Sequence, residues 1–165
     1  MVEISVTAEE HIQGYHAALD VVARERKYLT MLEAFPLAET RDFVLNMIKH
    51  RNPHIVATDG DRVVGWCDIT RDFFPTHRHC GSLGMGIIPD YRGKGLGRRL
   101  IAAALEKARQ ESFARIELSV HADNGRAIAL YEKTGFVVEG VLKRSVYIDG
   151  RYLDTICMAV MLDGQ

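Results

Sequence analysis

The sequence predicts an α/β fold in which a mixed, mostly antiparallel sheet of about seven strands is flanked by four helices. Short alternating or apolar segments, typical of strands, are interspersed with four segments whose apolar residues recur at helical spacing. Turn signals such as Asp59-Gly60 and Asp149-Gly150 separate consecutive strands. The 165 residues contain no internal repeat, low-complexity segment or linker, so we expect a single domain over residues 1–165.

In the first third of the chain, capping and proline signals bound two helices. Residues 2–6 alternate apolar and polar side chains, as a strand does. Thr7 and Glu10 have the spacing of a capping box, which predicts a helix from there to about residue 26. The helical pattern breaks between residues 27 and 40, and a second helix follows that ends before Pro53.

The rest of the chain alternates between strands and two further helices. Hairpin turns are expected around Gly60 and Gly150, and Gly135 is a suitable C-terminal stop for the last helix. We expect strands at residues 54–57, 62–69, 83–88, 115–120, 136–146 and 153–161, and helices at residues 96–111 and 125–133.

The composition is that of an ordinary globular protein, with 47% hydrophobic and 26% charged residues. A formal net charge of −1 gives no reason to expect nucleic acid or an anionic membrane as a partner. Cys67, Cys80 and Cys157 are odd in number and far apart, which favours free thiols in the cytoplasm. No apolar run approaches the ~20 residues of a membrane span, and no secretory pattern begins the chain. His77 and His79 lack further ligands at a recognised spacing, so we expect no metal.

The most informative stretch is the glycine-rich segment from Pro89 to Arg99, which joins a strand to a helix. Gly93, Gly95 and Gly97 allow backbone torsions that other residues avoid, and free N–H groups at a helix N-terminus bind anions. Basic side chains surround these glycines, namely Arg92, Lys94, Arg98 and Arg99. The segment fits neither a P-loop nor the dinucleotide fingerprint. It predicts a phosphate or pyrophosphate site; the alternative is a surface turn shaped by glycine.

Two blocks of this sequence resemble the GCN5-related N-acetyltransferase (GNAT) superfamily. The first is Arg92-x-x-Gly95-x-Gly97 after a strand, and the second runs from Asn124 to Phe136. With the strands between and after them, the resemblance covers roughly residues 61–162. It implies a GNAT-like fold, acetyl-CoA as the cosubstrate and direct transfer of an acetyl group to an amine in a ternary complex.

The resemblance also implies which residues contact acetyl-CoA. Main-chain groups of the glycine loop would hold the pyrophosphate: Arg92, Gly93, Lys94, Gly95, Leu96, Gly97 and Arg98. Met85 and Ile87 would run beside pantetheine, with the Met85 N–H facing the thioester oxygen. Asn124 would lie near the cofactor, or act only as a helix N-cap. Tyr131 would protonate the CoA sulfur, or be a half-buried core tyrosine.

Gly84 and Gly86 leave one face of their strand nearly bare. That bare face either leaves room for the thin pantetheine arm or allows close packing of a neighbouring strand.

The general base departs from the family's patterns. The positions where the resemblance places a glutamate carry Gly81 and Ser119, neither of which can take a proton. Glu117 shares a strand face with Ser119, so it is our candidate, with His79 and His121 as alternatives that could act through water.

The acceptor is predicted to be a small primary amine, because the chain most resembles the phosphinothricin and amino-acid N-acetyltransferase type. An early Glu25–Leu29 segment and a late Gly135-Phe136 pattern carry that likeness. The candidate pocket residues are Tyr28, Glu33, Trp66 and Asp68. Acetylation of a protein N-terminus or lysine, and a catalytically inactive CoA-binding sensor, are the alternatives. The resemblance further implies a homodimer.

Overall fold

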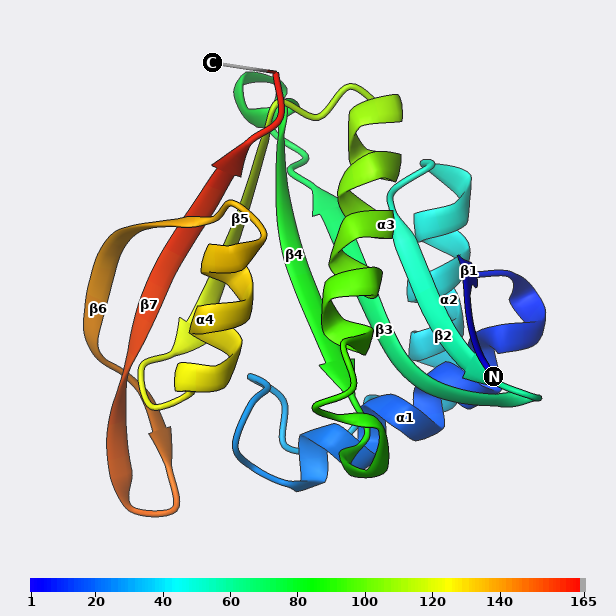
Figure 1. Ribbon diagram of the computed structural model, residues 1–165, viewed down its shortest axis with the longest axis horizontal. Helices are drawn as coiled ribbons and strands as arrows, with labels where there is room; N and C mark the ends of the chain where they lie inside the picture. Colours follow the sequence, from blue (N-terminus) through cyan, green and yellow to red (C-terminus); the bar gives the residue numbers. More distant parts are fainter. Residues whose placement is uncertain (164–165) are drawn as a thin grey trace.

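The structure is a computed structural model that describes residues 1–163; the last two residues of the predicted domain, 164 and 165, lie outside the described residues. Its four helices are α1 (Ile12–Arg24), α2 (Leu37–Lys49), α3 (Leu96–Gln110) and α4 (Gly125–Lys133). The strands are β1 (Val2–Val6), β2 (His54–Asp59), β3 (Arg62–Arg71), β4 (Cys80–Ile87), β5 (Arg115–His121), β6 (Val137–Ile148) and β7 (Arg151–Met161). Figure 1 shows these elements along the chain.

All seven strands form one sheet in the order β1-β2-β3-β4-β5-β7-β6. Every neighbouring pair is antiparallel except β4 and β5, which are parallel and are connected through α3. The predicted fold class, a mixed and mostly antiparallel sheet of seven strands with four helices, is therefore confirmed.

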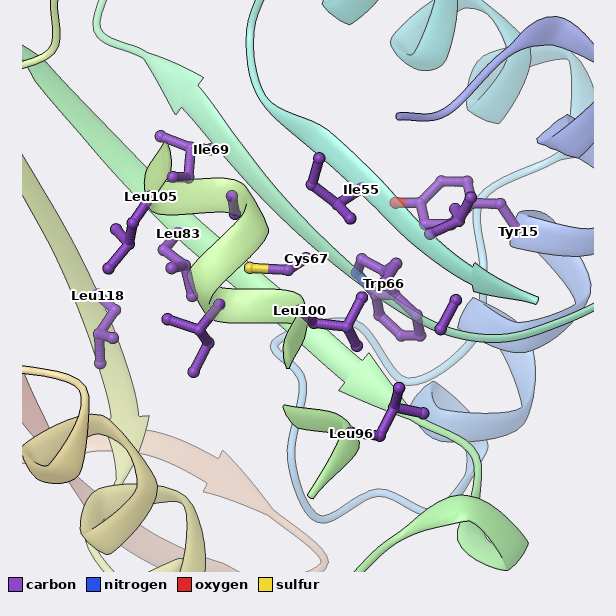
Figure 2. Close-up of a cluster of buried hydrophobic side chains, with 14 of the residues drawn as sticks. Tyr15, Ile55, Trp66, Cys67, Ile69, Leu83, Leu96, Leu100, Leu105 and Leu118 are labelled. Atoms are coloured by element: carbon purple, nitrogen blue, oxygen red, sulfur yellow. The ribbon is translucent and has the colours of Figure 1, made fainter. Parts of the chain in front are cut away.

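The helices cover both faces of the sheet, two on each (Figure 1). Trp66 of β3 packs edge-on against Tyr15 of α1, with ring centroids 5.7 Å apart, so its side chain faces α1. A Cβ on the preceding residue, Gly65, would lie 3.2 Å from Leu100 of α3. Because side chains alternate along a strand, even-numbered positions of β3 from Gly65 onward face α1 and odd-numbered positions face α3. Figure 2 shows the buried side chains of both layers.

Two predicted hairpins are confirmed by their backbone torsions. Gly60 has a φ of +58° between β2 and β3. Asp149 and Gly150 have φ values of +52° and +78° between β6 and β7. Two consecutive positive φ values are what a two-residue type I′ turn requires, which explains the Asp-Gly signal.

The predicted capping box at Thr7 is wrong. The Thr7 N–H donates to the His54 carbonyl (2.8 Å) and so extends the β1–β2 edge, and a 3₁₀ turn at Glu9–His11 comes before α1. The Thr7 hydroxyl is buried and has no hydrogen-bond partner among the described residues. The second helix begins directly after Pro36, earlier than its pattern suggested, because Pro36 suits the position before a first helical turn. No helix within residues 1–163 has the length and apolar character needed to cross a membrane.

Candidate active site

The sheet opens between its two parallel strands. β4 and β5 pair over only three residues each, Cys80–Ser82 with Arg115–Glu117. Beyond these pairs the two strands move apart, as Figure 1 shows. The far half of β4 therefore has a strand neighbour on one edge only.

The backbone of Met85 points into this opening. The N–H of Ile88 donates to the Val64 carbonyl of β3 at 3.0 Å, and bonded positions alternate with non-bonded ones along an antiparallel pair. The main-chain groups of Met85 and Ile87 therefore face away from β3, toward β5. The carbonyl of Ile87 is already used, because it accepts from Arg92 Nε at 2.7 Å. Met85 is left as an unpaired strand edge beside the opening.

The glycine loop ends β4 and begins α3 with the geometry of an anion site. Gly93 and Gly95 have φ values of +74° and +78°, torsions that glycine adopts without strain. Gly95 is the N-cap of α3, and no side chain caps the helix there. Its carbonyl accepts the first helical bond, from the Arg99 N–H, so the three amides between them have no intrahelical partner. These free amides fit a pyrophosphate.

The Arg92 side chain has a different role from the one that its position in the loop suggests. Its guanidinium forms a two-pronged ion pair with Glu25, at 2.9 and 2.5 Å, and lies 4.9 Å from the centre of the Tyr28 ring. Glu25 also raises the pKa of Arg92, so the pair stays charged. The predicted positive charge of Arg92 is therefore neutralised within the protein, and the side chain holds the α1–α2 connection against the glycine loop.

The other basic residues of the loop are distributed unevenly. Lys94 Nζ donates to the Asp90 carbonyl at 2.8 Å, and Arg99 reaches back to the Val2 carbonyl at 3.0 Å. Arg126 of α4 also reaches the loop: its Nη2 lies 2.5 Å from the place where a Cβ on Gly93 would be. A cation from a second element therefore lies over the anion site.

Helix α4 places Asn124 and Tyr131 beside the same opening. The Asn124 side chain accepts from the Ala127 N–H at 3.2 Å, which makes it the N-cap of α4. Leu130 packs against Gly97, so α4 lies beside the start of α3. Tyr131 is buried on the α3 face, and burial together with nearby Cys67 raises the pKa of its hydroxyl. A phenol in this setting keeps its proton and can act as a donor.

The two bare glycines of β4 are covered by β3. A Cβ on Gly86 would lie 2.3 Å from the Trp66 ring, and one on Gly84 would lie 3.5 Å from an oxygen of Asp68. Close packing of the neighbouring strand therefore explains Gly86, whereas a Cβ on Gly84 would make only an ordinary van der Waals contact, so room for pantetheine stays a prediction at Gly84.

The predicted acceptor-pocket residues lie in two places. Trp66 and Asp68 are neighbours on the α1 face of β3, the first in the core and the second half-buried. Tyr28 lies on the α1–α2 connection against Arg92 and is 39% exposed. Glu33 faces solvent on the same connection, where it pairs with Arg24 at 3.2 Å.

The candidate general bases also lie in different places. Glu117 faces the α1 side of the sheet opposite Ser82, and Arg115 holds it at 3.2 Å. His121 is buried at the end of β5 and its Nδ1 bonds the Lys27 carbonyl at 2.9 Å. His79 is exposed at the start of β4, the end opposite the glycine loop.

Two structural partners of this site cannot be found from the sequence. Glu25 belongs to the early Glu25–Leu29 segment, and its pairing with Arg92 spans 67 positions, which no local pattern reveals. Arg126 is exposed, and only the packing of α4 on α3 brings it to Gly93. No group of three or more His, Cys, Asp or Glu side chains in the described part of the chain could hold a metal ion.

The family model of the acetyltransferase (GNAT) family matches residues 17–136. Three curated relatives are similar in sequence. The L-amino acid N-acetyltransferase AaaT of Escherichia coli is 32% identical over 64% of this chain and 65% of its own. The spermidine N(1)-acetyltransferase of Vibrio cholerae is 40% identical over 46% of this chain and 44% of its own. The ribosomal protein bS18-alanine N-acetyltransferase of E. coli is 40% identical over 46% and 51%. The matches thus span about half to two thirds of each relative's length.

Solved structures share the fold over nearly the whole chain. A GNAT-family acetyltransferase from Streptococcus pneumoniae is 26% identical with a TM-score of 0.92, covering 98% of this chain and 100% of its own. A phosphinothricin acetyltransferase from Sinorhizobium meliloti, in complex with acetyl-CoA, is 20% identical with a TM-score of 0.90, covering 98% and 88%.

Proposed function

This chain belongs to the acetyltransferase (GNAT) family, and from that premise we propose that it acetylates the primary amine of a small molecule, such as an amino acid or an analogue. The N-acetyltransferase class and the acetyl-CoA cosubstrate follow from family membership. The observation that carries the proposal is that three features lie around the same opening of the sheet. These are the free amides at the start of α3, the strand edge at Met85 and the side chain of Tyr131.

Each part of that geometry has a role when acetyl-CoA is bound. The cosubstrate supplies an activated acetyl group on a thioester. The amides of the glycine loop hold its phosphates, Arg126 adds a cation over Gly93, and the Met85 N–H donates to the thioester oxygen. Tyr131 gives a proton to the leaving sulfur.

Direct transfer in a ternary complex is supported by the state of the nearest thiol. Cys67 lies next to the opening on the α3 face, but it is fully buried, and burial raises the pKa of its thiol well above the usual value. A thiol that resists ionisation is a poor nucleophile. The acetyl group therefore passes straight to the amine, and no acyl-cysteine forms.

The test of function is thiol release from acetyl-CoA across a panel of amino acids, polyamines and short peptides. Turnover with free amino acids or their analogues is the expected result. Turnover with peptides alone would move the acceptor to a protein N-terminus or lysine, as the ribosomal-protein relative suggests. Tight CoA binding without turnover on any acceptor would make the chain a sensor.

Tyr131→Phe tests the proton donor. We expect kcat to fall about 100-fold or more, in the range of lost general-acid catalysis, because the thiolate must leave unprotonated. The CoA dissociation constant measured by calorimetry should stay within about twofold, because the ring still fills its place in the core. Tyr147→Phe on exposed β6 is the matched control and should leave both values unchanged. An unchanged kcat in Tyr131→Phe would exclude the donor role.

We also propose a homodimer in the cytoplasm. The dimer is supported by β6, an edge strand whose exposed apolar side chains include Val137 and Val138. A cytoplasmic location is supported by three cysteines that are all free thiols.

A further inference from the structure

Asp68 stands over the backbone of β4 beside the opening of the sheet. It pairs in register with Gly84, and its two carboxylate oxygens lie 3.5 and 3.6 Å from the point where a Cβ on Gly84 would be. It faces the α1 side, as Trp66 two residues earlier does. Because Gly84 has no side chain, nothing on β4 separates the carboxylate from the strand segment that leads to Met85.

This carboxylate has no cationic partner. None of the ion pairs among residues 1–163 includes Asp68. A half-buried carboxylate is normally paired, because an isolated charge is poorly solvated away from water. The site therefore lacks one cation, and an ammonium group of an acceptor would supply it.

The groups that face Asp68 come from three elements. Tyr15 of α1 and Trp66 of β3 are neutral; burial, and after it the charge of Asp68, raises the pKa of Tyr15 and that of Cys67, the adjacent residue on the opposite face of β3. His54 pairs in register with Asp68 from β2, and burial lowers its pKa to about 4, so it is neutral as well. Burial raises the pKa of Asp68 to about 7, and the Trp66 indole, as a hydrogen-bond donor, lowers it partway back. A carboxylate in these surroundings accepts a proton near neutral pH.

Of the other candidate bases, two are already engaged and His79 lies at the end of β4 opposite the glycine loop. Arg115 lies 3.2 Å from the Glu117 carboxylate, which therefore already has a cationic partner. His121 uses Nδ1 to bond the Lys27 carbonyl. Asp68 is thus the acidic side chain on this face that is both beside the opening and free of a cation.

We propose that Asp68 is the general base of the acetyl transfer, an assignment that rests on the proposed function. The acceptor enters as an ammonium and gives one proton to an Asp68 oxygen. The freed lone pair forms the N–C bond as the C–S bond breaks, and Tyr131 gives its proton to the departing sulfur. The second nitrogen proton returns through water to Tyr131, and Asp68 releases its own proton to solvent, so one proton is released per turnover.

The first test compares Asp68→Asn with Asp68→Glu on the best acceptor of the panel. We expect Asp68→Asn to lower kcat about 100-fold or more, the range of general-base catalysis, with CoA affinity unchanged. Asp68→Glu should recover part of the rate, because it restores a carboxylate. Asp42→Asn makes the same chemical change on the exposed side of α2 and should leave the rate unchanged. A raised KM with an unchanged kcat would overturn the proposal, because it would show binding alone.

The pH profile separates a base from a binding group. In the wild type, kcat/KM should rise through pH of about 7 as Asp68 ionises and fall again above the pKa of the amine. In Asp68→Asn the limb near 7 should vanish, leaving a rise toward pH ~10 as the free amine loses its proton. A limb near 7 that persists in Asp68→Asn overturns the proposal, as does one that disappears in Glu117→Gln instead.

A third readout needs no turnover. The raised pKa of Asp68 means that its stabilising contribution is present at pH 4 and is lost as the pH rises through about 7. The melting temperature of Asp68→Asn minus that of the wild type should therefore grow by roughly 10 °C between pH 4 and 8. His54 titrates in the opposite sense in both proteins and cancels in this difference. A pH-independent difference would overturn the proposed protonation.

The proposed function can fail separately from this assignment. A wild-type protein that releases no thiol with any acceptor removes both the activity and its base. An active wild type whose Asp68→Asn variant keeps its rate and profile removes the base alone.

Discussion

At the scale of single residues, the interlocking of Gly86 with Trp66 holds β3 and β4 together at the edge of the site. The indole lies over the glycine so closely that a Cβ would come within 2.3 Å of the ring. The ring cannot move aside freely, because Tyr15 packs against it from α1. Asp68 lies two residues further along β3, so the position of the proposed base depends on this packing.

Gly86→Ala is therefore expected to destabilise the protein. Inserting one methyl group into a packed interior costs about 1–3 kcal/mol, which for a domain of this size lowers the melting temperature by roughly 3–10 °C. Thermal unfolding followed by circular dichroism measures it. Gly140→Ala on β6 is the control, since nothing lies within 4 Å of its added Cβ. Equal melting temperatures for the two variants would contradict the tight packing.

At the scale of elements, the connection between α1 and α2 is tied to both halves of the sheet. Glu25 binds Arg92 at the glycine loop, and Arg26 pairs with Asp149 in the β6–β7 turn at 2.7 Å. Both partners of the first pair are largely shielded, with side chains 22% and 23% exposed, so that pair is the stronger tie. The α1–α2 connection, which carries the candidate pocket residues Tyr28 and Glu33, and the loop proposed to bind phosphate are therefore linked by one ion pair.

Glu25→Gln should loosen that link. Removing one partner leaves the Arg92 charge partly buried and unpaired, which costs about 1–3 kcal/mol. We expect the CoA dissociation constant to rise about threefold to tenfold, in line with 0.7–1.4 kcal/mol, because Arg92 still bonds the Ile87 carbonyl. Calorimetric titration measures this change. Glu9→Gln breaks the exposed pair with Arg41 and should change little; equal affinities in both variants would contradict the link.

Among the elements, those whose conformation depends on neighbouring residues could be predicted from the sequence. Helix α3 and both Asp-Gly hairpins were predictable, because apolar spacing and turn torsions are set by neighbouring residues. The glycine loop could be located for the same reason. The Arg92–Glu25 pair and the covering of Gly86 by Trp66 could not, because both depend on which distant segments the sheet order brings together. The predicted helix cap at Thr7 is wrong because the Thr7 N–H instead donates to the His54 carbonyl and extends the pairing of β1 with β2.

At the scale of the whole molecule, β6 leaves one edge of the sheet uncovered by any described strand. It is 12 residues long, and its apolar side chains are widely exposed, including Val137 at 62% and Tyr147 at 64%. An exposed edge of this length favours pairing with another chain. The proposed homodimer would cover it.

Sedimentation equilibrium should therefore give twice the 18.5 kDa chain mass. Val137→Lys should shift the protein toward monomer, because a charge opposes burial of the edge. Val21→Lys on an exposed part of α1 is the matched control and should remain dimeric. A wild type that sediments as a monomer at micromolar concentration would exclude the dimer.

The Glu25–Arg92 pair has a consequence for exchanging specificity between relatives. The segment after Glu25 carries candidate determinants for the acceptor, so it is the obvious piece to transplant in a chimera. The residue that anchors this segment, however, is Arg92, which belongs to the glycine loop proposed to bind acetyl-CoA. A graft of residues 25–36 will keep its shape only if the recipient supplies an arginine that pairs with the incoming glutamate. Glu25 and Arg92 must therefore be transplanted together.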